Sequence, residues 1–135
     1  MISNLSKENN MNEITVKHLY TVEKYITFHV YIMSGDFSGC SNFCTSEEML
    51  QSAVEALDML HERLYGEYTL TDYDSDDYIL FQFQKYGHLK ISGQVGGSQS
   101  DQFLKFSLYS DQTFLRRLIT ELRYILQKSK AEAEP

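Results

Sequence analysis

The sequence predicts an α+β domain of two layers, in which an antiparallel sheet of about six to seven strands carries two helices on one face. Two observations support this fold. Several stretches alternate apolar and polar residues with the period of two that a half-buried strand requires. Two longer stretches place leucines at helical spacing, with charged residues between them. Their sequence along the chain predicts the order βββ-α-ββββ-α.

The first half predicts three strands followed by a helix. The strands are expected at 14–20, 25–33 and 37–44, with a turn at 34–36 and Gly39 at a bulge or close contact. Thr45 and Glu48 have the spacing of a capping box, and Gly66 is expected to end the helix that follows. The outward face of this helix is acidic.

The second half predicts a short strand at 67–71, a meander and a second helix. Alternation over 79–84, 89–95 and 104–109 indicates three strands, and Gly87 suits the short turn between the first two. Asp111 is expected to cap the last helix, whose outer face is basic.

The length of 135 residues suits one domain. We expect a flexible N-terminal tail over 1–10, a single domain over 11–128 and a flexible C-terminal tail over 129–135. Met11 is an alternative start. The first residues contain no apolar run typical of a secretory signal, and no stretch is long and apolar enough to cross a membrane. A cytoplasmic protein is therefore expected, with Cys40 and Cys44 reduced because an extended strand holds them too far apart to bridge.

The formal charge of −7 argues against a nucleic-acid binder, which normally carries a basic face. Acidity is compatible with a basic protein partner, although acidic proteins are common. The cluster Asp72, Asp74, Asp76 and Asp77 resembles the start of a calcium loop, but Asp77 and Phe83 stand where such a loop needs Gly and Glu. A solvated acidic turn and a patch for a basic partner are the other interpretations.

No constellation of residues predicts catalysis. Gly93, Gly96 and Gly97 precede a strand instead of a helix, so a glycine-rich turn is favoured over a phosphate site. The four histidines are scattered, and neither cysteine has a histidine in the same element. We therefore expect no enzyme activity, no cofactor and no metal.

The aromatic residues point to binding. If the apolar residues of 26–32 face the helices, the tyrosines between them lie on the uncovered sheet face, together with aromatics of the later strands. Ordinary cross-strand pairing is the alternative. These predicted surface aromatics are Tyr25, Tyr31, Tyr78, Phe103 and Tyr109.

Several turn and cap motifs together resemble a known family. They are Gly35-Asp36-Phe37-Ser38-Gly39, Asp72-Tyr73-Asp74-Ser75-Asp76, Gly87-His88, Ser92-Gly93-Gln94-Val95-Gly96-Gly97-Ser98 and Ser110-Asp111-Gln112-Thr113. From about Phe28 to Leu126 the chain resembles the WapI-like immunity proteins of bacterial polymorphic toxin systems. The resemblance implies tight non-covalent binding of a cognate toxin, often a nuclease. It implies no catalytic residue.

We therefore expect an immunity protein that inhibits its toxin stoichiometrically, without nucleic-acid or membrane partners. The expected contact residues are the surface aromatics named above together with Asp72, Asp74, Asp76 and Asp77. Two alternatives remain: a homo-oligomeric regulatory or ligand-binding module whose open sheet face pairs with a second copy, and an enzyme. A homodimer is compatible with either kind of binding protein.

Overall fold

The computed structural model describes residues 12–133. The predicted N-terminal tail at 1–10 and the alternative start at Met11 lie outside the described residues. The first half holds three strands and a helix: β1 (Asn12–Val22), β2 (Tyr25–Ser34), β3 (Phe37–Ser46) and α2 (Glu47–Arg63). The second half holds β4 (Glu67–Thr71), β5 (Tyr78–Phe83), a 3₁₀ turn η1 (Lys85–Gly87), β6 (Leu89–Val95), β7 (Leu104–Ser110) and α3 (Gln112–Ala133).

The α+β class and the order βββ-α-ββββ-α are confirmed, and so is the meander of the second half. The strands differ from the expected single sheet, because they form two antiparallel sheets of order β1-β2-β3 and β4-β5-β6-β7. Helix α2 separates β3 from β4 in the chain, and each half pairs only within itself. The same period-two pattern fits either arrangement, since each sheet buries one face and leaves the other exposed.

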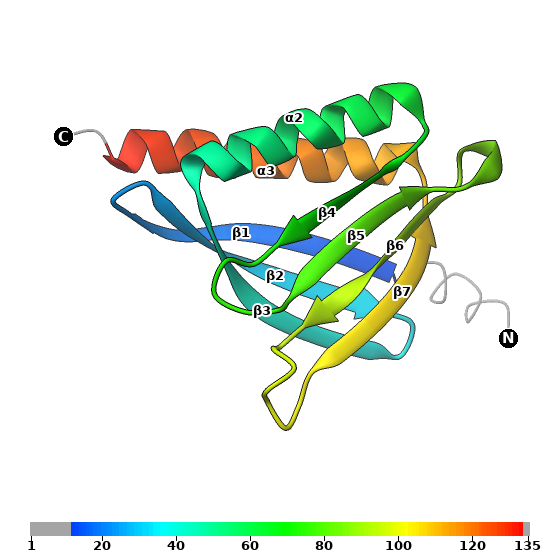
Figure 1. The fold of residues 1–135 in the computed structure, drawn as a ribbon, viewed down its shortest axis with the longest axis horizontal. Helices are drawn as coiled ribbons and strands as arrows, with labels where there is room; N and C mark the ends of the chain where they lie inside the picture. Colours follow the sequence, from blue (N-terminus) through cyan, green and yellow to red (C-terminus); the bar gives the residue numbers. More distant parts are fainter. Residues whose placement is uncertain (1–11, 134–135) are drawn as a thin grey trace, which may run out of the picture.

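The two sheets and both helices share one hydrophobic core. Figure 1 shows α2 and α3 side by side along one edge of the sheet pair. Helix α3 packs on β1, and α2 packs on β3 and β4. The largest side chains with no exposed surface are Phe28 and Phe43 of the first sheet and Phe81 of the second. Among the described residues no helix is long and apolar enough to cross a bilayer.

The helix ends differ from expectation in two places. The side chain of Ser46, one residue after the predicted cap Thr45, accepts the hydrogen bond from the Met49 N–H at 3.0 Å. Asp111 caps α3 as predicted, accepting from the Phe114 N–H at 3.0 Å. Helix α3 then continues to Ala133, into the segment expected as a C-terminal tail.

A buried chain of polar side chains explains why the end of α3 is ordered. Ser129, with no exposed surface, donates to Glu47 of α2 at 2.8 Å and accepts from Thr21 of β1 at 2.8 Å. The Thr21 hydroxyl also meets Nε2 of the buried His18 at 2.9 Å. The bonds of Ser129 to Thr21 and Glu47 tie β1, α2 and α3 together, and Thr21 in turn satisfies the buried His18 of its own strand.

At Gly93, β6 leaves no room for a side chain against the neighbouring β5. A Cβ atom at this position would lie 2.1 Å from the carbonyl oxygen of Tyr78 in β5. We predict that Gly93→Ala lowers the free energy of unfolding by about 1–3 kcal/mol, because the backbone of β5 must move. The neighbouring substitution Ser92→Ala, on a half-exposed residue, is the control and should change stability by less than about 0.5 kcal/mol. Equal urea midpoints for the two variants would contradict the prediction.

Candidate functional site

Asp77 is the buried centre of the acidic turn that joins β4 to β5. Its Oδ2 accepts hydrogen bonds from the Ser41 hydroxyl at 2.8 Å and the Gly96 N–H at 3.0 Å. Its Oδ1 accepts from Gln94 Nε2 at 3.1 Å and the Gly97 N–H at 2.8 Å. Only 2% of the residue is exposed. Because Ser41 belongs to β3 and Gln94 to β6, this one carboxylate links the two sheets.

Asp72 holds the other end of the same turn against β3. Its Oδ1 accepts from the backbone N–H groups of Cys44 at 2.8 Å and Asp74 at 3.2 Å, and its Oδ2 accepts from the Ser75 hydroxyl at 2.6 Å. The Tyr73 N–H donates in turn to the Cys44 carbonyl at 2.9 Å. The turn is therefore anchored on an edge strand of the first sheet by both backbone and side chain.

Asp76 lies on the exposed side of the turn and binds the loop that follows β6. It accepts from the Ser98 N–H and from Gln94 Nε2, both at 3.1 Å, and from the Ser98 hydroxyl. These bonds from Ser98 stabilise the ionised form and lower the pKa of Asp76 below its usual value.

The glycine-rich segment after β6 forms the turn that its sequence predicts. Gly96 and Gly97 have φ of +102° and +81°, which side chains rarely adopt. Their N–H groups converge on an anion as in a backbone nest, but that anion is the protein's own Asp77 carboxylate. The segment resembles a phosphate loop because its N–H groups bind an anion, but here the anion is a carboxylate of the same chain.

The turn does not have the geometry of a calcium site. Within residues 12–133, no group of three or more His, Cys, Asp or Glu side chains is placed to hold a metal ion. The oxygens of Asp72 and Asp77 are engaged by internal donors. Of the four aspartates, Asp74 and Asp76 are exposed to solvent.

The negative charge of the protein is concentrated in the segment that contains this turn. Ten of the chain's 19 acidic residues but only one of its 12 basic residues, Arg63, lie between Glu47 and Asp77. Helix α3 carries five of the basic residues, and Arg123 there pairs with Asp58 of α2 at 2.8 Å. The exposed carboxylates that remain in this segment make it acidic; they belong to Glu48, Glu55, Glu62, Glu67, Asp74 and Asp76.

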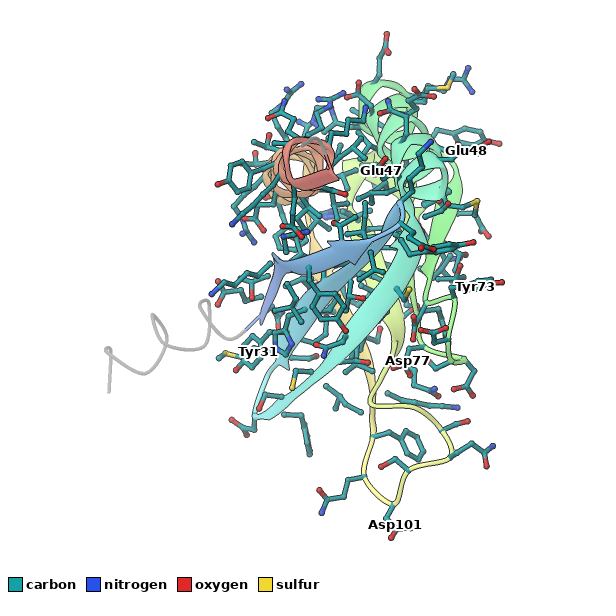
Figure 2. The ribbon with its side chains drawn as sticks, turned by 90° about the vertical axis from the view of Figure 1, so that its left-hand side faces the viewer. Tyr31, Glu47, Glu48, Tyr73, Asp77 and Asp101 are labelled. Atoms are coloured by element: carbon teal, nitrogen blue, oxygen red, sulfur yellow. The ribbon has the colours of Figure 1, made fainter. Side chains whose placement is uncertain are left out.

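Two tyrosines and a methionine form an exposed cluster where the start of α2 meets the acidic turn. The rings of Tyr25 and Tyr73 stack with centroids 6.3 Å apart, and with Met49 they line a hollow of about 160 Å³. Tyr73 is 75% exposed and Met49 58% exposed. Figure 2 shows Tyr73 and Glu48 both pointing outward on the same side of the molecule. We refer to Tyr25, Glu48, Met49, Tyr73 and Asp74 as the acidic–aromatic surface.

Asp74 is fixed close to the first sheet. Burial raises the pKa of the Cys44 thiol, and the neighbouring Asp74 carboxylate raises it further. Asp74 therefore lies near β3 even though it is exposed, on the turn whose ends Asp72 and Asp77 fix.

The other predicted contact residues lie elsewhere, because the strands form two sheets. Tyr31 is on the outer face of the first sheet, and Figure 2 places it opposite Tyr73. Tyr78 and Tyr109 are on the outer face of the second sheet, and Phe103 precedes β7. The aromatics expected on one open face are thus divided among separate surfaces. Their role in binding stays a prediction.

Three residues of the acidic–aromatic surface were not among the predicted contacts. Tyr73 lies inside the turn predicted to contact the toxin, between Asp72 and Asp74, although it is not one of the individually predicted contacts. Glu48 is predicted to complete the capping box and to lie on the acidic face of the helix, but its sequence position does not bring it to the tyrosines. The sequence does not predict that Met49 is exposed, because a methionine on an amphipathic helix is usually expected on the buried face.

The exposed groups on this surface are carboxylates and aromatic rings, and the fold that carries them is a two-sheet α+β domain. The chain belongs to the WapI-like immunity protein family, whose model matches residues 12–129. It is thus a bacterial immunity protein, as the turn and cap motifs predicted, and membership favours a non-catalytic role. Comparisons with curated proteins and with solved structures gave no match.

Asp77 generates the first prediction of this site. We expect Asp77→Asn to lower the free energy of unfolding by about 2–3 kcal/mol, because an amide loses the charged acceptor and turns a donor toward donors. Asp74→Asn, on the exposed side of the same turn, is the matched control and should change stability by less than about 0.5 kcal/mol. Chemical denaturation measures both. A loss in Asp77→Asn no larger than in the control would contradict the assigned role.

The lowered pKa of Asp76 generates a pH-dependent prediction. A carboxyl whose pKa is lower in the folded state stabilises the fold above its unfolded pKa, near 4, and this contribution disappears as the pH falls through the folded value. Ser98→Ala removes one cause of the shift. The wild type should therefore unfold at higher urea than Ser98→Ala at about pH 7, and this difference should shrink at about pH 2. Ser107→Ala serves as the control, and a pH-independent difference for Ser98→Ala would refute the assignment.

Proposed function

We propose that this immunity protein neutralises a cognate toxin by stoichiometric non-covalent binding, and that the acidic–aromatic surface contacts the toxin. Family membership supports a toxin partner. The observation that carries the choice of surface is that the exposed carboxylates of Glu48 and Asp74 flank the hollow lined by Met49 and the stacked Tyr25 and Tyr73, within a segment that holds ten of the chain's 19 acidic residues.

The chemistry of this surface favours a basic partner. Exposed carboxylates attract cationic side chains and accelerate encounter with a basic protein. Tyrosine rings offer large contact area and an attractive face for a cation, and both properties are common at binding hot spots. A toxin that acts on nucleic acid needs a basic surface for its substrate, so a nuclease is the class of toxin that fits best.

The turn at 72–77 is suited to present this surface because it is held from within. Asp72 and Asp77 are buried and bonded to β3, β6 and the glycine turn, whereas Tyr73 and Asp74 between them are exposed. Rigid presentation reduces the ordering entropy that binding must overcome. Inhibition by occupation of the toxin surface needs no catalytic group on the immunity protein.

We predict that reversing two charges of this surface, Glu48→Lys with Asp74→Lys, weakens binding of the cognate toxin domain about a hundredfold. Close charge pairs across interfaces contribute about 1.5 kcal/mol or more each, and about 1.4 kcal/mol corresponds to a factor of ten. Isothermal titration calorimetry with the toxin domain recovered by pull-down measures the effect. A toxin-protection assay in cells should show the same loss.

The matched control reverses two exposed or half-exposed acids outside this surface, Glu13→Lys with Asp101→Lys, which changes the net charge equally. Figure 2 shows Asp101 at the far tip of the molecule. If both double variants weaken binding equally, only the overall charge matters and the surface assignment fails. If neither does, the partner does not recognise acidity.

A further inference from the structure

Two phenylalanines are exposed at the end of the molecule away from the helices. Phe37, the first residue of β3, is 70% exposed, and Phe103, just before β7, is 46% exposed. Phe37 belongs to the first sheet and Phe103 directly precedes a strand of the second, yet both line the same two hollows of about 420 and 340 Å³. We call these two residues and the hollows between them the phenylalanine tip. Phenylalanine has no polar atom to interact with water, so such a pair favours burial in an interface.

The floor of the phenylalanine tip is firmly packed. A Cβ atom at Gly39 would lie 3.0 Å from Cβ of Leu104 and 3.2 Å from Cγ2 of Val95, so the two sheets are in contact there. The Ser34 hydroxyl donates to the Ser107 carbonyl at 3.3 Å on one side of the tip. The hollows are therefore formed before any partner binds, and each is large enough for an aromatic ring.

Charges of opposite sign flank the tip. Asp36 precedes Phe37 in the turn after β2, and Lys105 lines the larger hollow beside Phe103. Among the described residues neither takes part in an ion pair. An interface with two-fold symmetry requires a surface that complements itself. The exposed ring of Phe37 can fill a hollow of a second copy, and Asp36 can face Lys105 of that copy.

From this arrangement we propose that the phenylalanine tip binds a second copy of this chain. In the symmetric dimer Phe37 of each copy enters a hollow of the other, and Asp36 of each copy faces Lys105 of the other. The helices and the acidic–aromatic surface remain uncovered, since Figure 2 shows Tyr73 and Glu48 away from the end that carries Asp101. A dimer of this kind leaves both toxin-binding surfaces accessible, and the proposal does not depend on the proposed function.

Analytical ultracentrifugation of the full chain over a range of concentrations tests the dimer. We expect the wild type to dimerise reversibly and Phe37→Ser with Phe103→Ser to raise the dimer dissociation constant at least tenfold. Tyr86→Ser, which removes a 95% exposed aromatic ring at η1, is the matched control and should dimerise like the wild type. Circular dichroism checks that each variant is folded. A wild type that stays monomeric at all concentrations overturns the proposal.

A charge swap tests the geometry without removing the phenylalanines. Asp36→Lys alone and Lys105→Asp alone should each weaken the dimer, because they place like charges opposite one another, and the double swap should restore it. A double variant that dimerises no better than the single variants overturns the symmetric arrangement. If the phenylalanine substitutions abolish toxin binding while the wild type is monomeric, the tip belongs to the toxin interface and the proposal is wrong.

Discussion

The buried carboxylate of Asp77 is the interaction on which the arrangement of the two sheets depends. A carboxylate that is almost fully removed from water is tolerated only when its oxygens are satisfied by donors, and Asp77 has four of them. The donors come from β3, from β6 and from the glycine turn after β6. Fixing one anion therefore fixes the relative position of three segments that are far apart in the sequence. Gly96 and Gly97 are part of this requirement, because their left-handed backbone directs both N–H groups to the same carboxylate.

Much of the fold follows from local patterns. The period-two alternation located the strands within a few residues, and Asp111 and Gly66 marked helix ends at or near the right places. The pairing of these strands into two sheets was not predictable in the same way. Alternation specifies that Phe28 and Phe81 are buried, but it does not specify whether each faces a helix or another sheet. The Thr45 cap was displaced to Ser46 because β3 continues through Thr45, whose side chain faces the core.

The candidate site was even less predictable from the sequence than the pairing of the strands. Four neighbouring aspartates look equivalent in the sequence. In the structure, Asp72 and Asp77 are buried and accept hydrogen bonds from inside the protein, whereas Asp74 faces solvent. Only the position of Ser41, Gln94 and the glycine turn around Asp77 separates these roles, and those contacts span 17 to 36 residues of sequence. The stacking of Tyr25 on Tyr73 is equally long-range. The acidic character of the first helix, by contrast, was visible from its composition.

The aspartate turn combines the two properties that a binding surface needs. The buried Asp72 and Asp77 accept hydrogen bonds from inside the protein. They therefore make the turn rigid and have no free acceptor for a partner. Tyr73 and Asp74, held between them, offer a ring and a charge whose positions are already fixed. Arg123 of α3 pairs with Asp58 of α2 where the two helices meet, whereas Glu48 and Asp74 take part in no ion pair among the described residues. Under the proposed function, substitutions at Tyr73, Asp74 or Glu48 change toxin binding, whereas the fold continues to rest on the buried aspartates. The proposed function thus assigns toxin recognition to exposed residues and stability to buried residues of the same short turn.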